Sequence, residues 1–420
     1  MIEQVLTALS WYILVTALGW LVWPLAFRLL PGLPDRGYTL SRALSLLLVG
    51  YVFWLLGVLG LLQNTLGGIL LAVLLVGGAS VWINRAHPDR SRRAEWLAEN
   101  RQGVIPPEIL FAVALFCWAL FRATHPAIRY TEKPMELAFL NGVRLSPALP
   151  PRDPWLAGYA ISYYYFGYVI IALLADLAGA ASGVAFNLGI ALLFALTLIG
   201  AYGAAYNLIA ARSESSGERA AGSAPLWALL GPLFVGIMGN LEGLFELLRG
   251  LNVSLFGGRL WAWLDIQGLE APAGQVLWPP TQWGTWWWWH ASRVIHDRTP
   301  AGASSGLQPI DEFPFFSFLL GDMHPHVLAL PFVFIALMLA FNVLAEREPQ
   351  RGGLRAAQAA LYVVAFGALA FLNTWDLPIY LFILIAAMAV RRIRLRGWFE
   401  SRDLARPVLQ GAGIGALGLL

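Results

Sequence analysis

The fold of this chain is decided by a polar hexapeptide and the apolar run that follows it: Gly321-Asp-Met-His-Pro-His326 and Val327-Leu-Ala-Leu-Pro-Phe-Val-Phe-Ile-Ala-Leu-Met-Leu-Ala-Phe341. The apolar run is typical of a membrane-spanning helix, so the hexapeptide falls at a lipid–water boundary. Proline disfavours helical backbone just before it, and in an extended backbone residues two apart point to the same side. This pattern predicts that three side chains lie together, Asp322, His324 and His326.

Ionisable groups at membrane depth are costly and usually line a substrate, ion or catalytic path. An acid with two imidazoles suits a divalent metal, a phosphate or a sugar hydroxyl, so the hexapeptide predicts a functional site. The simpler alternative is a polar helix cap in the headgroup layer, but one acid and two histidines exceed what a cap requires.

Composition predicts an integral, multi-pass protein of the cell membrane. Of the 420 residues 58% are hydrophobic and 13% are charged, and the mean hydropathy is +0.64, whereas a soluble domain has about 25% charged residues. The net charge of +3 is small and the arginines lie in short loops, so nucleic acid binding is not indicated. The single cysteine, Cys117, excludes an intrachain disulfide and a cysteine–metal site.

The apolar windows predict an all-α, polytopic transmembrane helix bundle of about 10–11 spans, with two long extracytoplasmic loops. The windows are residues 4–30, 40–62, 66–83, 105–121, 161–179, 183–211, 225–248, 327–344, 356–372, 377–390 and 407–420. The arginine-rich loops 85–101 and 391–406 are expected on the cytoplasmic side. Counting from them, residues 122–160 and 322–326 both fall outside. Three full crossings between 160 and 248 would place the following loop on the cytoplasmic side, which does not fit this count. One segment there must therefore be a half-crossing or lie in the interface, or another crossing lies between 251 and 318.

The sequence suggests two regions, an N-terminal three-helix membrane segment (1–104) and a membrane domain (105–420). The second region holds the first outer loop (122–160) and the second outer loop (249–326). The chain stops inside an apolar stretch at Leu420, which indicates a last segment that is cut short.

The first outer loop contains carboxylates that suit acid–base or metal chemistry. Glu132 and Glu136 are four apart, so a helix would place them on one face. Asp153 lies in a segment too rich in proline to be helical. A carboxylate here could deprotonate an acceptor hydroxyl or hold a metal beside a leaving phosphate; the alternative is a solvated surface loop. Three tyrosines then begin the next apolar window, more than a one-sided interfacial belt requires: Tyr163, Tyr164 and Tyr165.

The second outer loop is rich in tryptophan, with Trp278, Trp283 and the run Trp286–Trp289. Tryptophan prefers the membrane interface, so this loop either lies flat on the bilayer or offers aromatic platforms for sugar rings or a lipid chain. Other polar residues inside apolar windows are interpreted as buried, hydrogen-bonded groups, with Asp376 also a candidate for the site. They include Asn240, Glu242 and Glu246, of which the two glutamates share a helix face.

Four motifs together resemble the Tyr-Tyr-Tyr (YYY) domain family of bacterial and archaeal membrane proteins, over roughly residues 111–375. The motifs are Glu132-Lys-Pro-Met-Glu136, Asp153-Pro-Trp155, Tyr163-Tyr-Tyr-Phe-Gly167 and Phe313-Pro-Phe-Phe-Ser-Phe-Leu-Leu-Gly-Asp-Met-His-Pro-His326. In layout this family is distantly similar to the C-type membrane glycosyltransferases, which use polyprenyl-phosphate sugar donors. The resemblance implies a glycosyltransferase-C-like bundle in which Glu132 or Asp153 corresponds to the acid of the first loop. This chain has three helices before that loop where those enzymes usually have one.

The first hypothesis is therefore a membrane glycosyltransferase-like enzyme that transfers a sugar from a polyprenyl-phosphate donor at the outer membrane face. The catalytic candidates are Glu132, Asp153 and Asp322. The candidates for substrate binding are Lys133, Trp155, Tyr163, Tyr164, Tyr165, His324, His326 and Asp376. Asp322, His324 and His326 are also candidate ligands for a divalent metal, Mg²⁺ or Mn²⁺. The alternatives are a transporter or flippase of a lipid-linked or small polar solute, and a non-catalytic membrane scaffold.

Overall fold

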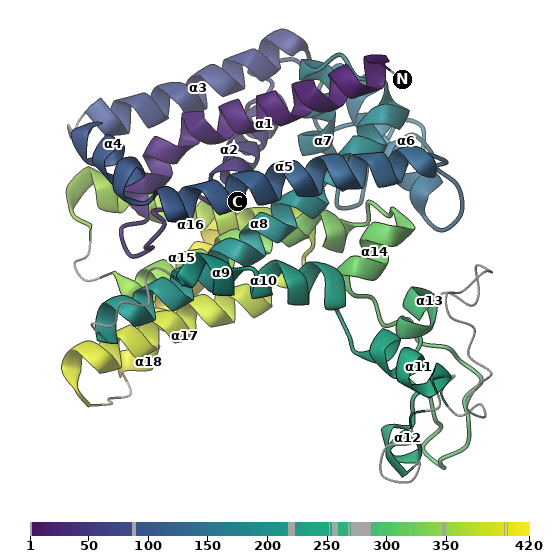
Figure 1. Ribbon diagram of the computed structural model, residues 1–420. Helices are drawn as coiled ribbons and strands as arrows, with labels where there is room; N and C mark the ends of the chain where they lie inside the picture. Colours follow the sequence, from purple (N-terminus) through teal and green to yellow (C-terminus); the bar gives the residue numbers. More distant parts are fainter. Residues whose placement is uncertain are drawn as a thin grey trace. The chain divides into compact units, whose positions relative to one another are not determined.

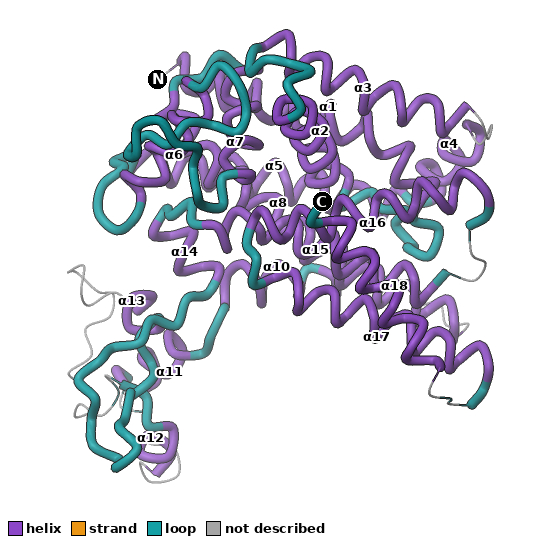
Figure 2. The backbone as a smooth tube through the Cα atoms, turned by 180° about the vertical axis from the view of Figure 1, so that it is seen from behind, coloured by secondary structure: helices purple, strands orange, loops and turns teal. Residues whose placement is uncertain are grey.

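The computed structural model describes residues 2–85, 90–216, 223–251, 253, 259–267, 269, 287–346, 350–398, 400 and 402–420. These residues form helices and loops without a named strand (Figures 1 and 2). Two isolated bridges, Arg152 with Ala160 and Arg298 with Ser304, are the extended pairings among them. The predicted all-α class is thus confirmed.

The chain divides into two compact units, residues 1–232 with 321–420 (unit 1) and residues 233–320 (unit 2). Unit 1 contains α1 (Ile2–Leu29), α2 (Ser41–Val58), α3 (Leu66–Arg85), α4 (Arg90–Glu99), α5 (Arg101–Thr124), α6 (Lys133–Leu145), α7 (Phe166–Leu177), α8 (Ser182–Ser216), α9 (Ala224–Ala228), α15 (Pro325–Ala345), α16 (Gly352–Leu372), α17 (Asp376–Arg396) and α18 (Arg402–Gly418). Unit 2 contains the π-helix η2 (Phe234–Met238), α11 (Glu242–Gly250), α12 (Arg259–Leu264), α13 (Trp287–Ala291) and α14 (Pro314–Leu320). The chain passes from unit 1 to unit 2 within α10 (Leu230–Leu233).

The described residues contain fewer candidate membrane spans than the 10–11 predicted. Among the described residues seven helices are long and apolar enough to cross a bilayer: α1, α2, α3, α5, α8, α15 and α16. Counting the pair broken after Met238 as one span gives eight. α7 has only 12 residues, and α17 has four arginines near its end. The expected multi-pass membrane protein is therefore confirmed, and the span count is corrected downward.

α15 and α8 form the centre of unit 1, because both are apolar on every side and so must be covered. α15 packs against α2, α7, α8, α16 and α17. Small residues allow the close approaches: a Cβ on Gly167 of α7 would lie 2.7 Å from Leu328, and one on Gly200 of α8 would lie 2.8 Å from Phe334. Such glycines are typical of tightly packed membrane helices. By contrast, few residues of α3 and α5 are buried, as expected for helices that face lipid.

Two helices of unit 1 connect arginine-rich segments to the segment that holds the hexapeptide. α5 begins at Arg101 and ends at Thr124, and Arg122 near that end lies against Gly321. α17 begins at Asp376, which interacts electrostatically with His326, and ends at Arg396. With a rise of about 1.5 Å per residue, each helix is roughly 30 Å long or more, so its two ends lie far apart. Both arginine-rich ends thus lie opposite the hexapeptide, which supports the predicted sidedness; the sidedness itself stays a prediction.

Candidate functional site

The backbone of the hexapeptide is held from both sides at Met323. The Met323 N–H donates to Glu136 Oε2 at 2.8 Å, and the Tyr168 hydroxyl donates to the Met323 carbonyl at 3.1 Å. Gly321 has a φ of 73°, in the left-handed region that favours glycine. A Cβ there would overlap the Arg122 guanidinium. The turn therefore requires glycine at this position, and side chains of α6 and α7 fix the backbone two residues later.

The two histidines form a chain of polar contacts with Glu132. His324 Nε2 lies 2.8 Å from Glu132 Oε2, and His324 Nδ1 lies 2.9 Å from His326 Nδ1. The side chains of His324 and Glu132 are 31% and 54% exposed, so this chain opens to solvent. If Glu132 accepts the Nε2 proton of a neutral His324, then His324 Nδ1 accepts from His326. The lone pair of a neutral His326 then lies on Nε2. This arrangement resembles a general base oriented by a carboxylate.

Helix α15 begins at Pro325, with His324 as its extended N-cap (φ −63°, ψ 154°). The predicted non-helical backbone at His324 is confirmed, but His326 is already helical. The expectation that Asp322 lies beside both imidazoles therefore needs correction, because the three residues do not share an extended backbone. The contacts of His324 are with Glu132 and His326, while Asp322 is directed to Glu136.

Glu136 and Asp322 form a buried acid pair. Glu136 is fully buried, and Asp322 is 7% exposed. Glu136 Oε1 and Asp322 Oδ1 have no N–H or O–H donor in the described part of the chain, yet the two carboxyl groups are within hydrogen-bonding reach of each other. Burial, followed by the charge of Asp322, raises the pKa of Glu136 to about 10. A proton held between the two groups at neutral pH accounts for both orphan oxygens.

Positive charge lies close to this pair. Lys133, the first residue of α6, is 7% exposed and interacts electrostatically with both Asp322 and Glu136. Burial and the nearby Arg122 lower the pKa of the Lys133 ammonium. Arg122 itself donates to Asn187 Oδ1 through Nε (3.0 Å) and Nη2 (2.9 Å). The site thus combines a solvent-facing base with a buried acid pair and a buried cation.

The predicted tyrosines lie before α7 rather than within it, because the helix begins only at Phe166. Tyr163 stacks on Phe139 with centroids 5.5 Å apart, and its hydroxyl lies 3.5 Å from His324 Nε2. Tyr164 packs at an angle on Tyr163. Tyr165 accepts a hydrogen bond from Trp54 Nε1 at 2.9 Å, which gives it a packing role against α2. The three tyrosines therefore do not surround a helix end as the sequence suggested, and only Tyr163 contacts a histidine of the site.

Three other predicted residues lie around the site with different contacts. Asp376, the first residue of α17, interacts with His326 electrostatically and accepts from Asn373 Nδ2 at 3.1 Å. Trp155 is 94% exposed. Asp153 Oδ1 accepts from the N–H groups of Trp155 and Leu156, both at 2.8 Å. Within the described residues the hydrogen bonds of Asp153 are all local, so it shapes its own turn.

The predicted metal site at Asp322, His324 and His326 stays a prediction. One metal ion needs its donor atoms close together. Among the described residues, three donor atoms lie within 4.8 Å of one another in unit 2, on Glu242, Glu246 and His290. The backbone at the start of α15 offers few N–H groups to an anion. Pro325 has no N–H, and the N–H groups of Val327 and Leu328 both donate to the His324 carbonyl.

The site residues predicted from the sequence did not include Glu136, Arg122 or Tyr168. The sequence did place Glu136 on one helix face with Glu132, but it gave no reason to pair Glu136 with Asp322. Tyr168 lies inside an apolar window and Arg122 directly follows one. At such positions the sequence does not show whether a polar side chain faces the bundle or the interface. Trp278, Trp283 and Trp286 lie outside the described residues, as do the side chains of Trp287 and Trp288.

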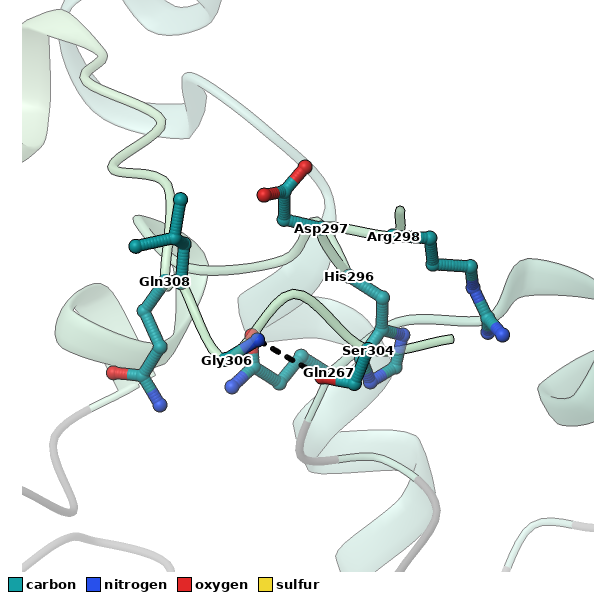
Figure 3. A pocket seen from close by; sticks show the side chains of 8 residues that line it. Gln267, His296, Asp297, Arg298, Ser304, Gly306 and Gln308 are labelled. Carbon is teal, nitrogen blue, oxygen red and sulfur yellow. Dashed lines mark hydrogen bonds between the residues drawn. The ribbon is translucent and has the colours of Figure 1, made fainter. Parts of the chain in front are cut away.

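Unit 2 contains a separate polar pocket (Figure 3). It is lined by Gln267, His296, Asp297, Arg298, Ser304, Gly306, Leu307 and Gln308. His296 Nδ1 lies 3.3 Å from Asp265 Oδ1, and Arg298 Nη2 lies 2.8 Å from Asp265 Oδ2. Asp265 is more than half exposed. These are surface ion pairs of small energetic weight, and none of the residues predicted for the site lines this pocket.

Comparison with known proteins identifies the family. A model of an uncharacterized membrane protein family (DUF2298) matches residues 48–420. No curated protein and no solved structure matches the chain. The chain therefore belongs to the uncharacterized membrane protein family DUF2298, and the family match covers every residue of the site described above.

Proposed function

We propose that this protein is an integral membrane transferase that moves a sugar from a polyprenyl-phosphate donor to an acceptor hydroxyl at the outer membrane face. The single observation that carries the proposal is the chain of contacts from Glu132 through His324 to His326 at the start of a membrane helix. A carboxylate-oriented imidazole is the arrangement that general-base catalysis requires. Its place at the edge of an apolar bundle suits a reaction between a lipid-linked donor and a water-soluble acceptor.

In this mechanism His326 accepts the proton of the acceptor hydroxyl, with Glu132 and His324 stabilising the imidazolium that forms. The hydroxyl oxygen attacks the anomeric carbon of the donor. The bond between that carbon and the phosphate oxygen breaks, and the electron pair leaves with the polyprenyl phosphate. Positive charge from Lys133 favours the phosphate as it gains charge.

The buried acid pair has a positioning role in this proposal. Glu136 holds the Met323 N–H, and so fixes the segment that carries His324. Glu136 keeps its proton at neutral pH, and Lys133 lies close enough to interact electrostatically with both carboxyl groups. A positioning acid of this kind predicts that Glu136→Gln retains most of the activity, since an amide can still accept from the Met323 N–H.

A second candidate function, a proton-coupled carrier of a lipid-linked or small polar solute, is favoured by the same acid pair. A buried carboxyl that holds a proton at neutral pH is suited to exchanging it during transport. In this alternative the proton on Glu136 is essential, so Glu136→Gln abolishes coupling while the histidine variants are less affected. The two candidates therefore make opposite predictions for Glu136→Gln and His324→Gln.

The test uses the full chain in proteoliposomes with polyprenyl-phosphate sugars as donors. Transfer of labelled sugar to acceptors is measured for the wild type, His324→Gln, Glu132→Gln and Glu136→Gln, and proton uptake with solute movement is measured in the same vesicles. Asp265→Asn is the matched control, because it alters an exposed His–carboxylate pair in unit 2. Transfer lost in the first two variants and kept in the control supports the transferase; proton-linked solute movement without transfer contradicts it.

A further inference from the structure

Unit 2 contains a second cluster of two carboxyls and an imidazole. Glu242 and Glu246 lie one turn apart on α11, and His290 lies on α13. One donor atom from each residue lies within 4.8 Å of the other two. His290 Nδ1 is 3.4 Å from Glu246 Oε1. All three residues belong to the same compact unit.

The two carboxyl groups of this cluster are buried without adequate partners. Glu242 and Glu246 are each 2% exposed. Both oxygens of Glu242 and Oε2 of Glu246 have no hydrogen-bond partner among the described residues. Burying carboxylates without partners is costly, and a cation held between the two groups would remove that cost.

We propose that Glu242, Glu246 and His290 bind one divalent transition-metal ion, with Zn²⁺ as the best fit. Two ligand atoms about 2.1 Å from a zinc ion at the tetrahedral angle lie about 3.4 Å apart, which is the distance between His290 Nδ1 and Glu246 Oε1. A mixed set of imidazole and carboxylates favours zinc over Mg²⁺ or Ca²⁺, which prefer oxygen ligands alone. Three protein ligands leave a fourth position for water.

The surrounding contacts prepare the site before any ion binds. Asn240 Nδ2 donates to the Ala291 carbonyl at 2.7 Å, and Asn240 Oδ1 accepts from the Glu242 N–H at 3.1 Å. Asn240 thereby links the start of α11 to the end of α13. Residues four apart on a helix share a face, so both glutamates are directed to the same place. The His290 side chain is 37% exposed, which gives an ion a route from solvent.

A bound ion would join α11 to α13 directly. Both helices are short, with nine and five residues, and short helices gain most of their stability from packing rather than from their own hydrogen bonds. The ion would therefore act as a cross-link within unit 2, independently of any reaction at Glu132 and His324.

The experiment measures zinc binding by the full-length protein, purified in detergent with a tag that contains no histidine. The protein is stripped with a chelator, and Zn²⁺ is titrated in competition with a fluorescent indicator. We expect one zinc per chain for the wild type and a loss of affinity of at least about tenfold in Glu246→Gln and His290→Gln. Asp265→Asn, which alters the exposed carboxylate beside His296, should bind zinc like the wild type.

X-ray absorption on the zinc-loaded wild type provides a readout that does not depend on variants folding. It should show nitrogen and oxygen ligands at about 2.0–2.2 Å and one imidazole. A wild type that binds no zinc at micromolar concentration overturns the proposal. So does zinc that is retained in Glu246→Gln and His290→Gln but lost in His324→Gln, because the ion would then belong to the other histidine cluster.

Discussion

The two acid–histidine clusters of this protein have similar compositions but differ in how their buried charge is satisfied. In unit 1 the buried Glu136 accepts a backbone N–H, lies beside Asp322, and has Lys133 nearby. In unit 2 the buried Glu242 and Glu246 leave three oxygens without a partner among the described residues. The first cluster is satisfied by a proton and an ammonium. For the second we propose a cation, so residue types alone do not distinguish a proton site from a metal site.

The partly buried ion pair of Arg42 and Glu108 in unit 1 provides a third point of comparison. Arg42 donates to both carboxylate oxygens of Glu108, through Nη1 at 2.9 Å and Nη2 at 2.5 Å, and Tyr38 donates to Oε1 at 2.7 Å. A bidentate pair with an added hydrogen bond satisfies the carboxylate fully. Such a pair joins α2 to α5 and requires no ligand, which makes the unsatisfied oxygens of unit 2 more informative.

The largest expected effect is on turnover when the imidazole that links Glu132 to the base His326 is removed. His324→Gln should lower sugar transfer by about 100-fold or more, the range of general-base contributions. The side chain is 31% exposed, so the melting temperature should change little. Turnover and melting curves measured on the same preparation check this. Normal transfer with a large loss of stability would instead favour the polar helix cap.

Zinc should distinguish the two clusters by stability. At a free concentration about 100 times its dissociation constant, an ion that binds only the folded state adds about 2.7 kcal/mol to the free energy of unfolding. We expect this gain in the wild type and in Glu136→Gln, and its loss in Glu246→Gln. Unfolding in detergent, followed with and without added Zn²⁺, measures it. A zinc effect that disappears in Glu136→Gln would reverse the comparison.

The proton held by Glu136 predicts how stability depends on pH. The pKa of this carboxyl is raised from 4.5 to about 10 in the folded protein, so between these values the folded state binds more protons than the unfolded state. The free energy of unfolding should therefore fall as pH rises through this window, by at most about 1.4 kcal/mol per pH unit from this group. In Glu136→Gln the slope should be smaller. Denaturant unfolding from pH 6 to 9 compares the two proteins, and equal slopes would argue against a proton at this site.

The smallest effect is expected at Asp153, which the sequence suggested as a catalytic acid. Its carboxylate accepts two N–H groups of its own turn, and loss of such local bonds costs about 1 kcal/mol. Asp153→Ala should thus lower the melting temperature slightly while sugar transfer continues. Asp153→Asn, which keeps an acceptor oxygen, should behave like the wild type in both measurements. Loss of transfer in Asp153→Asn at normal stability would restore Asp153 as a catalytic candidate.

The sequence by itself determined the membrane class and most helices, because long apolar runs have few alternatives in a chain of this composition. It also determined the importance of Gly321–His326, since charged groups beside a span are rare. The number of spans was overestimated, because apolar length does not distinguish a full span from the short α7 or from the helix broken after Met238.

Only the tertiary structure decided which polar residues meet. Glu132 and His324 are almost two hundred residues apart, and their contact depends on the starts of α6 and α15 being brought together within unit 1. The interaction of Asp322 with Glu136, on α6, likewise joins residues far apart in the sequence. The same holds for Glu246 and His290, whose contact depends on α11 packing against α13. The periodicity of a helix specifies which of its faces a side chain occupies. Which other helix that face contacts is decided by packing between helices, and local sequence does not encode that packing.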